Sequence, residues 1–171
     1  MFRDLKNDEI DVRISMIKQN GLSLLLYKDA RVDQNILDET VGQMNWQKHY
    51  SRENANCIVS IWDKEKKQWI EKEDTGTESY TEKEKGLASD SFKRACFNWG
   101  IGRELYTAPF IWIKAEDCNI KQISGKYSCS DKFVVEKIKI EDKQITGLSI
   151  INLTNKKRVF IYKKQGGNKD E

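Results

Sequence analysis

The sequence predicts an α+β fold, in which antiparallel β-hairpins and a β-meander pack against one main α-helix. Three observations favour this class. Several short runs alternate apolar and polar residues, as strands do when one face of their sheet is solvated. Asn20-Gly21 lies between two apolar runs, which is typical of a β-hairpin. Residues 88–99, in contrast, place apolar side chains at helical spacing.

The N-terminal part of the chain predicts a hairpin followed by a short helix. Residues 11–27 are rich in leucine and β-branched side chains, so we expect one strand on each side of the Asn-Gly turn. Residues 29–42 then predict a helix. Asp29 or Asp33 would be its N-cap, and Gly42 would end it.

A meander and the main helix follow. Residues 46–50, 57–62 and 69–72 alternate in the manner of consecutive antiparallel strands. Thr81–Glu84 has the pattern of a capping box, which marks the start of the main helix. The segment Gly100-Ile101-Gly102 is expected to end it. The apolar stripe of this helix consists of Ala88, Phe92, Ala95, Cys96 and Trp99.

The C-terminal part returns to strand patterns. Three further strands are predicted there, at residues 133–140, 145–153 and 158–162. Residues 116–130 are polar and poorly patterned, and they predict a loop or connector. The expected organisation is a core domain over residues 1–115, a β-rich extension of the same domain over residues 116–163, and a flexible tail over residues 164–171.

Composition narrows the class of protein. The 171 residues include 30 Lys plus Arg and 27 Asp plus Glu, a formal net charge of +3. Residues 1–90 hold 14 basic and 18 acidic side chains, a net charge of −4, whereas residues 91–171 hold 16 and 9, a net charge of +7. This asymmetry indicates a local basic face that the total charge hides. Solvated surface charge is the alternative explanation.

The predicted location is cytoplasmic, with no membrane partner. No apolar run approaches the roughly 18 residues of a membrane span. Residues 1–10 are charged and lack the apolar stretch of a signal peptide. The four cysteines show no close paired spacing, which argues against a disulfide scaffold.

No catalytic residue, metal ligand or cofactor is predicted, so the protein is expected not to be an enzyme. His49 is the only histidine, and no Cys-x-x-Cys pair is present for zinc. The glycines at 100 and 102 lack the rest of a P-loop, so ATP use is not supported. One alternative is a metal-dependent nuclease using Asp74 and Glu78. Another is a module that docks an acidic protein through its basic half.

Two groups of cations stand out against this background. Lys93 and Arg94 lie on the main helix away from the apolar stripe, about 100° apart around its axis. Arg103 follows the helix end and would join them if the glycines fold the chain back. Lys28 and Arg31 flank Asp29 at the start of the earlier helix, where exposed amides favour anions. Solvated side chains or an internal salt bridge to Asp33 are the alternative explanations.

The main helix resembles a known family at several positions. The run from Glu84 to Ala95 contains Ser89-Asp90-Ser91-Phe92-Lys93-Arg94-Ala95 and continues to Trp99-Gly100. It is similar to the signature helix of the Rad-fifty-two-type single-strand DNA annealing proteins. Upstream, Lys28–Val32 and Asn45-Trp46 resemble that family's preceding helix and its exit. The likeness covers roughly residues 10–110, and the short chain resembles the phage or prophage (Sak-like) group.

This resemblance implies a function. Such proteins form homo-oligomeric rings or arcs, hold single-stranded DNA in a basic groove and anneal complementary strands without ATP in homologous recombination and DNA repair. By this resemblance, the groove residues are Lys93, Arg94 and Arg31, and Lys28 and Arg103 extend the set by proximity. Phe97 stands where eukaryotic members often have a further arginine. A single-strand-binding protein or an exonuclease is a further candidate partner.

Overall fold

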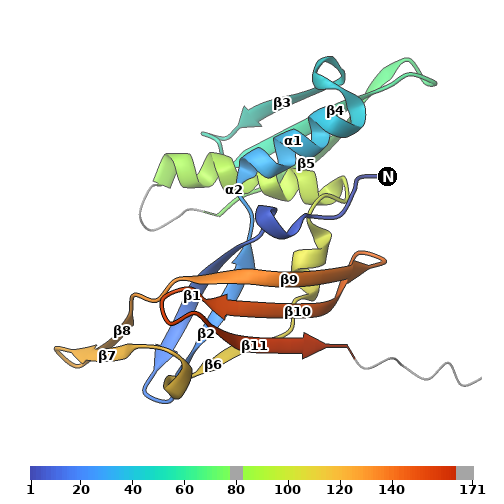
Figure 1. The fold of residues 1–171 in the computed structure, drawn as a ribbon. Coiled ribbons are helices and arrows are strands. Elements are labelled where there is room, and N and C mark those ends of the chain that lie inside the picture. The colour runs from blue at the N-terminus through green and yellow to red at the C-terminus, as the bar shows by residue number, and fades with distance from the viewer. Residues whose placement is uncertain (78–82, 165–171) are drawn as a thin grey trace, which may run out of the picture. The chain divides into compact units, whose positions relative to one another are not determined.

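The computed structural model describes residues 1–77 and 83–164, without the side chains of residues 83–85 (Figure 1). This described part contains two α-helices and eleven strands, and every strand pairing in it is antiparallel, which confirms the α+β class. Glu78, the first half of the predicted capping box Thr81–Glu84, and residues 165–171 of the predicted tail lie outside the described residues.

The chain divides into two compact units. Unit 1 comprises Met1–Asp4 and Asp29–Arg103, and unit 2 comprises Leu5–Lys28 and Glu104–Glu171. The division expected after residue 115 falls inside unit 2. The reason is a long-range pairing, since Leu22 near the N-terminus lies opposite Ile113 in one sheet.

Unit 1 contains the predicted short helix and meander. Its elements are α1 (Ala30–Val41), η2 (Gln43–Asn45), β3 (Trp46–Ser51), β4 (Asn56–Asp63), β5 (Gln68–Thr75) and α2 (Lys83–Asn98). The strands form one sheet in the order β3-β4-β5. Asp29 is the N-cap of α1, because its carboxylate accepts a hydrogen bond of 2.8 Å from the Arg31 amide. Asp33 is instead a fully buried residue of the helix, and Gly42, with φ 87°, ends it.

The core of unit 1 lies between its sheet and α2. Cys57 and Val59 of β4 are fully buried, and so are Ala95 and Cys96 of α2. The helix contacts both β4 and β5. Two further rings, Trp46 and Phe92, stack with centroids 6.2 Å apart. The apolar spacing of α2 therefore fixes which side of the helix remains for solvent.

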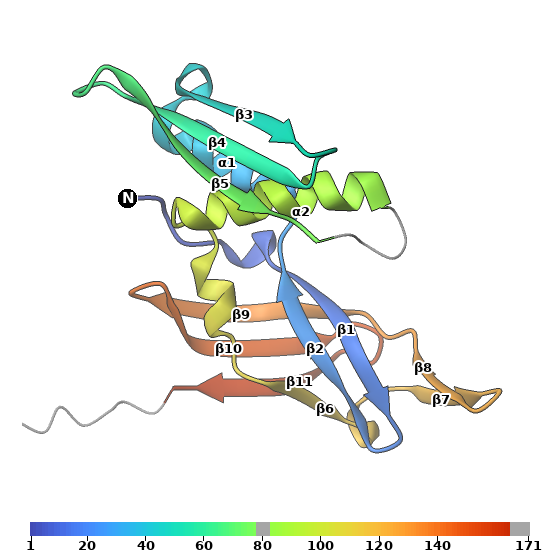
Figure 2. The same ribbon diagram turned by 180° about the vertical axis from the view of Figure 1, so that it is seen from behind.

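Unit 2 is built from strands and short 3₁₀ turns (Figure 2). Its elements are η1 (Asn7–Glu9), β1 (Asp11–Lys18), β2 (Gly21–Tyr27), η3 (Arg103–Thr107, starting at the last residue of unit 1), β6 (Ile111–Lys114), η4 (Ala115–Asp117), β7 (Ile120–Ile123), β8 (Lys126–Cys129), β9 (Phe133–Glu141), β10 (Gln144–Asn152) and β11 (Lys157–Lys163). Two three-stranded sheets run in the orders β1-β2-β6 and β11-β10-β9, and β7 pairs with β8. The predicted N-terminal hairpin and the three C-terminal strands are confirmed.

The prediction of a loop over residues 116–130 is wrong. This segment contains η4 and the β7–β8 hairpin, which turns at Ser124 and Gly125 with positive φ at both residues. Most side chains of the two strands are exposed, so the hairpin lacks the apolar alternation that marks a half-buried strand.

Gly21 owes its identity to close packing as well as to the turn. A Cβ atom built on Gly21 would lie 2.3 Å from the carbonyl oxygen of Ile113 and 2.7 Å from the ring of Trp112. Gly21 is the first residue of β2, opposite Lys114 of β6. The glycine thus lets the two strands approach each other where β2 begins.

A buried polar network lies at the base of the β7–β8 hairpin. The carboxylate of Asp131 accepts hydrogen bonds from the backbone and side-chain amides of Asn119, each 2.9 Å long, and from the side-chain amide of Asn152 at 2.7 Å. Asn152 is fully buried, and it also donates to the carbonyl of Asp117 at 3.2 Å. These bonds connect the hairpin base to the end of β10.

Candidate nucleic-acid interface

The candidate interface is the side of α2 that does not pack on the sheet. Ser91, Phe92, Ala95 and Cys96 are buried, whereas Lys93 is half-buried and Arg94 is exposed. Lys93 and Arg94 are consecutive, so their side chains leave the helix about 100° apart. Each cation therefore meets different neighbours.

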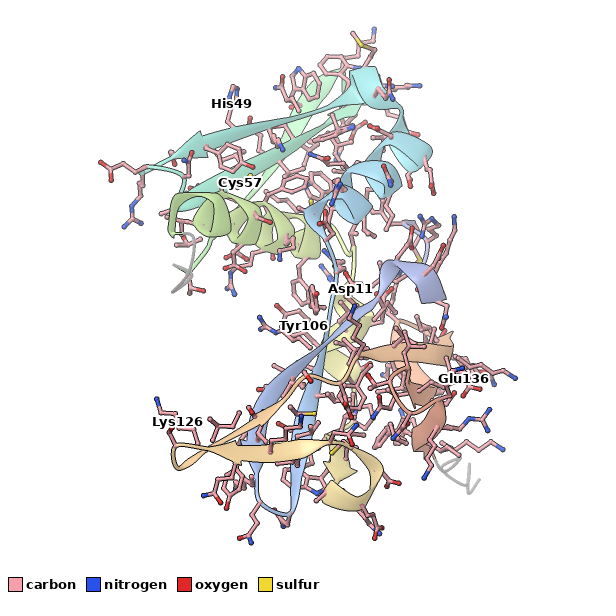
Figure 3. All side chains as sticks on the ribbon, turned by 60° about the vertical axis from the view of Figure 1, so that its left-hand side comes forward. Asp11, His49, Cys57, Tyr106, Lys126 and Glu136 are labelled. Carbon is pink, nitrogen blue, oxygen red and sulfur yellow. The ribbon has the colours of Figure 1, made fainter. Side chains whose placement is uncertain are left out.

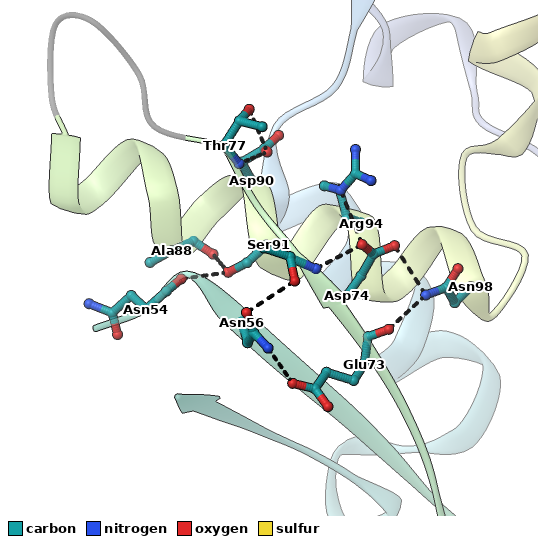
Figure 4. Close-up of polar contacts among 11 residues, drawn as sticks. Asn54, Asn56, Glu73, Asp74, Thr77, Ala88, Asp90, Ser91, Arg94 and Asn98 are labelled. Carbon is teal, nitrogen blue, oxygen red and sulfur yellow. Dashed lines mark hydrogen bonds and ion pairs between the residues drawn. The ribbon is translucent and has the colours of Figure 1, made fainter. Parts of the chain in front are cut away.

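Arg94 is oriented by the end of β5. Its Nε donates to Oδ1 of Asp74 at 3.2 Å, and 43 % of the Arg94 side chain is exposed. Asp74 is held in turn by the side-chain amide of Asn98, which donates to its Oδ2 at 3.2 Å and to the Glu73 carbonyl at 3.0 Å (Figure 4). Within the described residues the two terminal nitrogens of Arg94 make no hydrogen bond, so they remain available to an anion.

The loop after β5 is fastened to the same helix. Asp90 accepts hydrogen bonds from the Thr77 amide at 2.8 Å and from its hydroxyl at 3.3 Å (Figure 4). The Ser91 hydroxyl donates to the carbonyl of Asn54 at 3.0 Å. Asp90 and Ser91 thus fasten α2 to the loop after β5 and to the turn between β3 and β4.

Gly76 makes this docking possible. A Cβ at residue 76 would lie 2.6 Å from the amide nitrogen of Ser91 and 2.9 Å from the carbonyl of Leu87, both of them helix backbone. We expect Gly76→Ala to destabilise the protein by about 3 kcal/mol, because neither contact can yield by a side-chain rotation. Urea unfolding measures the change. Gly147→Ala is the control, since its Cβ meets the Lys139 side chain at 3.3 Å, and a loss as large there would contradict the explanation.

Lys93 lies near the start of α1. Asp29, the N-cap, pairs with Arg31 through Nε at 3.1 Å, and 83 % of the Arg31 side chain is exposed. The hydrogen bonds from Arg31 hold the pKa of Asp29 below its usual value, and the positive charge of Lys93 lowers it further. The ammonium group of Lys93 is thus close enough to act on Asp29. In the described part of the chain Lys93 makes no hydrogen bond or ion pair of its own.

Arg103 occupies a different place, at the C-terminal end of α2. Its Nε donates to the Phe97 carbonyl at 2.8 Å and its Nη2 to the Asn98 carbonyl at 3.0 Å. Lys72 donates to the same Asn98 carbonyl at 2.8 Å. Gly100 and Gly102, with φ of 96° and 71°, do fold the chain back after the helix. The Arg103 guanidinium is thereby brought to the end of α2, where it caps the helix carbonyls. Its two capping nitrogens are therefore occupied.

Lys28 differs from the other cations because it is buried, with 7 % of its surface exposed. It is also the last residue of a segment of unit 2, whereas Asp29 begins the main segment of unit 1. A contact between Lys28 and a phosphate stays a prediction, and the Lys28 side chain offers little exposed surface for such a contact.

The described carboxylates at the end of β5 lie on both faces of the strand, and Glu78 of the nuclease alternative lies outside the described residues. Asp74 faces α2 and is bound by Arg94 and Asn98, whereas Glu71 and Glu73 lie on the other face of β5 and accept from Ser60 and Asn56 at 3.2 and 2.6 Å. Within residues 1–77 and 83–164, no three His, Cys, Asp or Glu side chains are grouped so as to hold a metal ion.

The single histidine and the cysteine of its sheet do not face each other. His49 lies opposite Ile58, and Cys57 lies opposite Tyr50, so alternation places His49 and Cys57 on opposite faces (Figure 3). Burial raises the pKa of the Cys57 thiol to about 11, which suits a core residue rather than a nucleophile.

The residues that hold the cations in place could not be identified from the sequence. Asp74 was expected in the nuclease alternative, and Asn98 and Lys72 carried no expected role. The alternation of β5 is the one sequence signal that places Lys72 and Asp74 on the same face.

Comparisons with known proteins give no relative. No family model, no characterised protein sequence and no solved structure matches this chain. Neither helix of the described part has the length and apolar character needed to cross a bilayer.

Proposed function

We propose that the protein binds single-stranded DNA on the solvent side of α2 and anneals complementary strands without ATP. The proposal includes a homo-oligomeric ring or arc and a role in recombination and repair of the phage or prophage type. The observation that supports it is the hydrogen bonding of the Arg94 guanidinium group. Its Nε is fixed by Asp74, while its terminal nitrogens are open to a phosphate.

An arginine held in this way is preorganised for a phosphate. The guanidinium plane is set before the ligand arrives, so less side-chain entropy is lost on binding. Arginine presents paired donors that match phosphate oxygens. The Asp74 carboxylate binds only the Nε side of the guanidinium group. It thereby fixes the direction in which the two terminal nitrogens point.

Lys93 and Arg31 add charge beside the start of α1. Arg31 is highly exposed and Lys93 has no partner among the described residues, so both can approach a phosphate. Contacts of this kind bind the backbone and leave base edges free for pairing. Annealing breaks no covalent bond, which agrees with a site that needs no nucleophile, metal or nucleotide.

A single subunit offers only a few such contacts, and assembly would multiply them through effective concentration. The oligomer is tested first by its native mass in size-exclusion chromatography with light scattering. A multiple of 20.0 kDa is expected, and a stable monomer would contradict the ring or arc.

The annealing assay tests the DNA surface. Each phosphate contact to a single strand contributes about 0.7 to the slope of log K against log salt, or about 5-fold in affinity at 0.1 M salt. We expect Lys93→Ala and Arg94→Ala each to slow annealing of complementary oligonucleotides by about tenfold or more, because the loss repeats in every subunit. Native mass should be unchanged.

Lys64→Ala is the matched control for this assay. Lys64 lies in the exposed turn between β4 and β5, and its replacement by alanine removes one positive charge, as the other two substitutions do. It should anneal at the wild-type rate. Wild-type annealing by both Lys93→Ala and Arg94→Ala would overturn the proposal, and so would equal losses in all three variants.

A further inference from the structure

A second basic surface lies on unit 2, on the solvent face of the sheet β11-β10-β9. Ile145, Leu148 and Ile150 of β10 are buried in the core beneath this sheet. The alternate positions point outward: Gly147 lies opposite both Lys139 and Lys163, and Ser149 lies opposite both Lys137 and Ile161. We call the surface formed by these outward residues the lysine trough. It consists of Lys137, Lys139, Gly147, Ser149, Ile161 and Lys163.

The trough has small residues along its floor. Gly147 has no side chain and Ser149 has a short one, so the middle strand is low between its two neighbours. The residues of the trough line a hollow of about 600 Å³. Since neighbouring strands are about 4.8 Å apart, the backbones of Lys139 and Lys163 are separated by about 10 Å. That width fits one extended chain.

The charge of the trough is positive. Lys137 and Lys163 have no ion pair within the described residues, and Lys139 pairs with Glu141 at 2.9 Å. Both members of that pair are more than half exposed, so the pair is weak and opens at little cost. Glu136, the other nearby carboxylate, is bound by Arg158. Glu136 also lies beside Ser149 and Lys137, but with Arg158 the cations around the trough still outnumber the two carboxylates.

We propose that the lysine trough binds the phosphate backbone of a single nucleic-acid strand. Its width suits one strand, and its three ammonium groups, two on β9 and one on β11, can each meet a phosphate. Ile161, 69 % exposed, provides an apolar contact for sugar or base. The aromatic ring of Tyr162 belongs to the opposite face with Leu148, so the trough holds the backbone without stacking bases. This surface belongs to another unit than α2, and its binding does not rest on the proposed function.

The experiment uses the full chain carrying Lys93→Ala and Arg94→Ala, so that the binding which remains reports other surfaces. Fluorescence anisotropy with labelled oligo(dT) is measured from 0.05 to 0.3 M salt. Adding Lys139→Ser and Lys163→Ser should lower affinity by about 25-fold at 0.1 M salt and reduce the salt slope by about 1.4.

Lys121→Ser with Lys126→Ser is the matched control, because these exposed lysines of the β7–β8 hairpin lie off the trough and carry the same charge (Lys126 in Figure 3). The control pair should change the affinity of the parent chain for oligo(dT) by no more than about twofold. Equal losses in both pairs, no loss in the trough pair, or no salt-dependent binding by the parent chain would each overturn the trough. Wild-type annealing by the parent chain would instead overturn the α2 site alone.

The nature of the occupant has its own test. Poly-L-glutamate of the same number of charges is titrated against labelled oligo(dT) bound to the same parent chain. We expect it to displace the DNA at least tenfold less well than unlabelled oligo(dT). Equal displacement by the two polymers would indicate that the trough binds an acidic protein segment as well as it binds DNA, and it would overturn the proposal.

Discussion

Replacing Phe92 with alanine is expected to destabilise the protein by about 3–5 kcal/mol, the usual cost of deleting a buried aromatic ring. Phe92 is 1 % exposed, stacks on Trp46, and receives the Lys48 ammonium 4.4 Å from its ring centroid. Removal of the ring leaves a cavity between α2 and the sheet, and it strips the face over which Lys48 lies. Urea unfolding followed by tryptophan fluorescence measures the loss.

Phe92→Leu is the companion variant. It retains most of the buried volume, so it should lose much less stability than Phe92→Ala. A change below about 1 kcal/mol for Phe92→Ala would show that the packing of α2 contributes little to unit 1. Because Lys93 and Arg94 follow directly, Phe92→Ala should also weaken DNA binding at temperatures where unit 1 begins to unfold.

Asp131→Ala is expected to have the second large effect, about 3 kcal/mol, through unit 2. The variant leaves the Asn119 amide and the buried Asn152 amide without their acceptor. A buried donor that loses its partner, here the Asn152 amide, bears a desolvation cost of about 1–3 kcal/mol, and the lost bonds from Asn119 add to it. Thermal unfolding at pH 7 measures the loss, and Asp142→Ala, in the exposed turn between β9 and β10, is the control.

The same carboxylate makes stability depend on pH. Burial would raise the pKa of Asp131, but the hydrogen bonds from Asn119 and Asn152 outweigh it and hold the pKa below its ordinary value of 3.8. A depressed pKa in the folded state stabilises the protein above 3.8, and this contribution is lost as the pH falls through the folded-state pKa. The difference between wild type and Asp131→Ala should therefore shrink below pH 4. A constant difference would contradict this assignment.

Much of the fold could be predicted because most elements bury one face. The strands of residues 133–163 and the helix around Phe92 carry clear apolar periods, and the structure places them accordingly. β7 and β8 expose most of their side chains, so no period marks them. β6 was missed for another reason: it is four residues long, and its partner β2 lies far away in the sequence.

The candidate site was predicted less completely, since a sequence identifies cations but not their partners. Arg31, Lys93 and Arg94 have surface for a ligand, whereas Arg103 caps the end of α2. The tie from Asp74 to Arg94 joins residues 20 positions apart, and it depends on how β5 lies against α2. The lysine trough depends on strand register, which the residue order alone does not give.

The pairing of β2 with β6 has a consequence for synthesis of the chain. Leu24 pairs with Ile111, so the β1–β2 hairpin leaves the ribosome long before its third strand exists. Until residues 111–114 emerge, the edge of β2 offers open backbone groups beside Leu22 and Leu24, which is the kind of edge that nascent chains use to aggregate. All of residues 29–103 are translated in that interval. The nascent hairpin therefore has to stay soluble while the main segment of unit 1 is being synthesised.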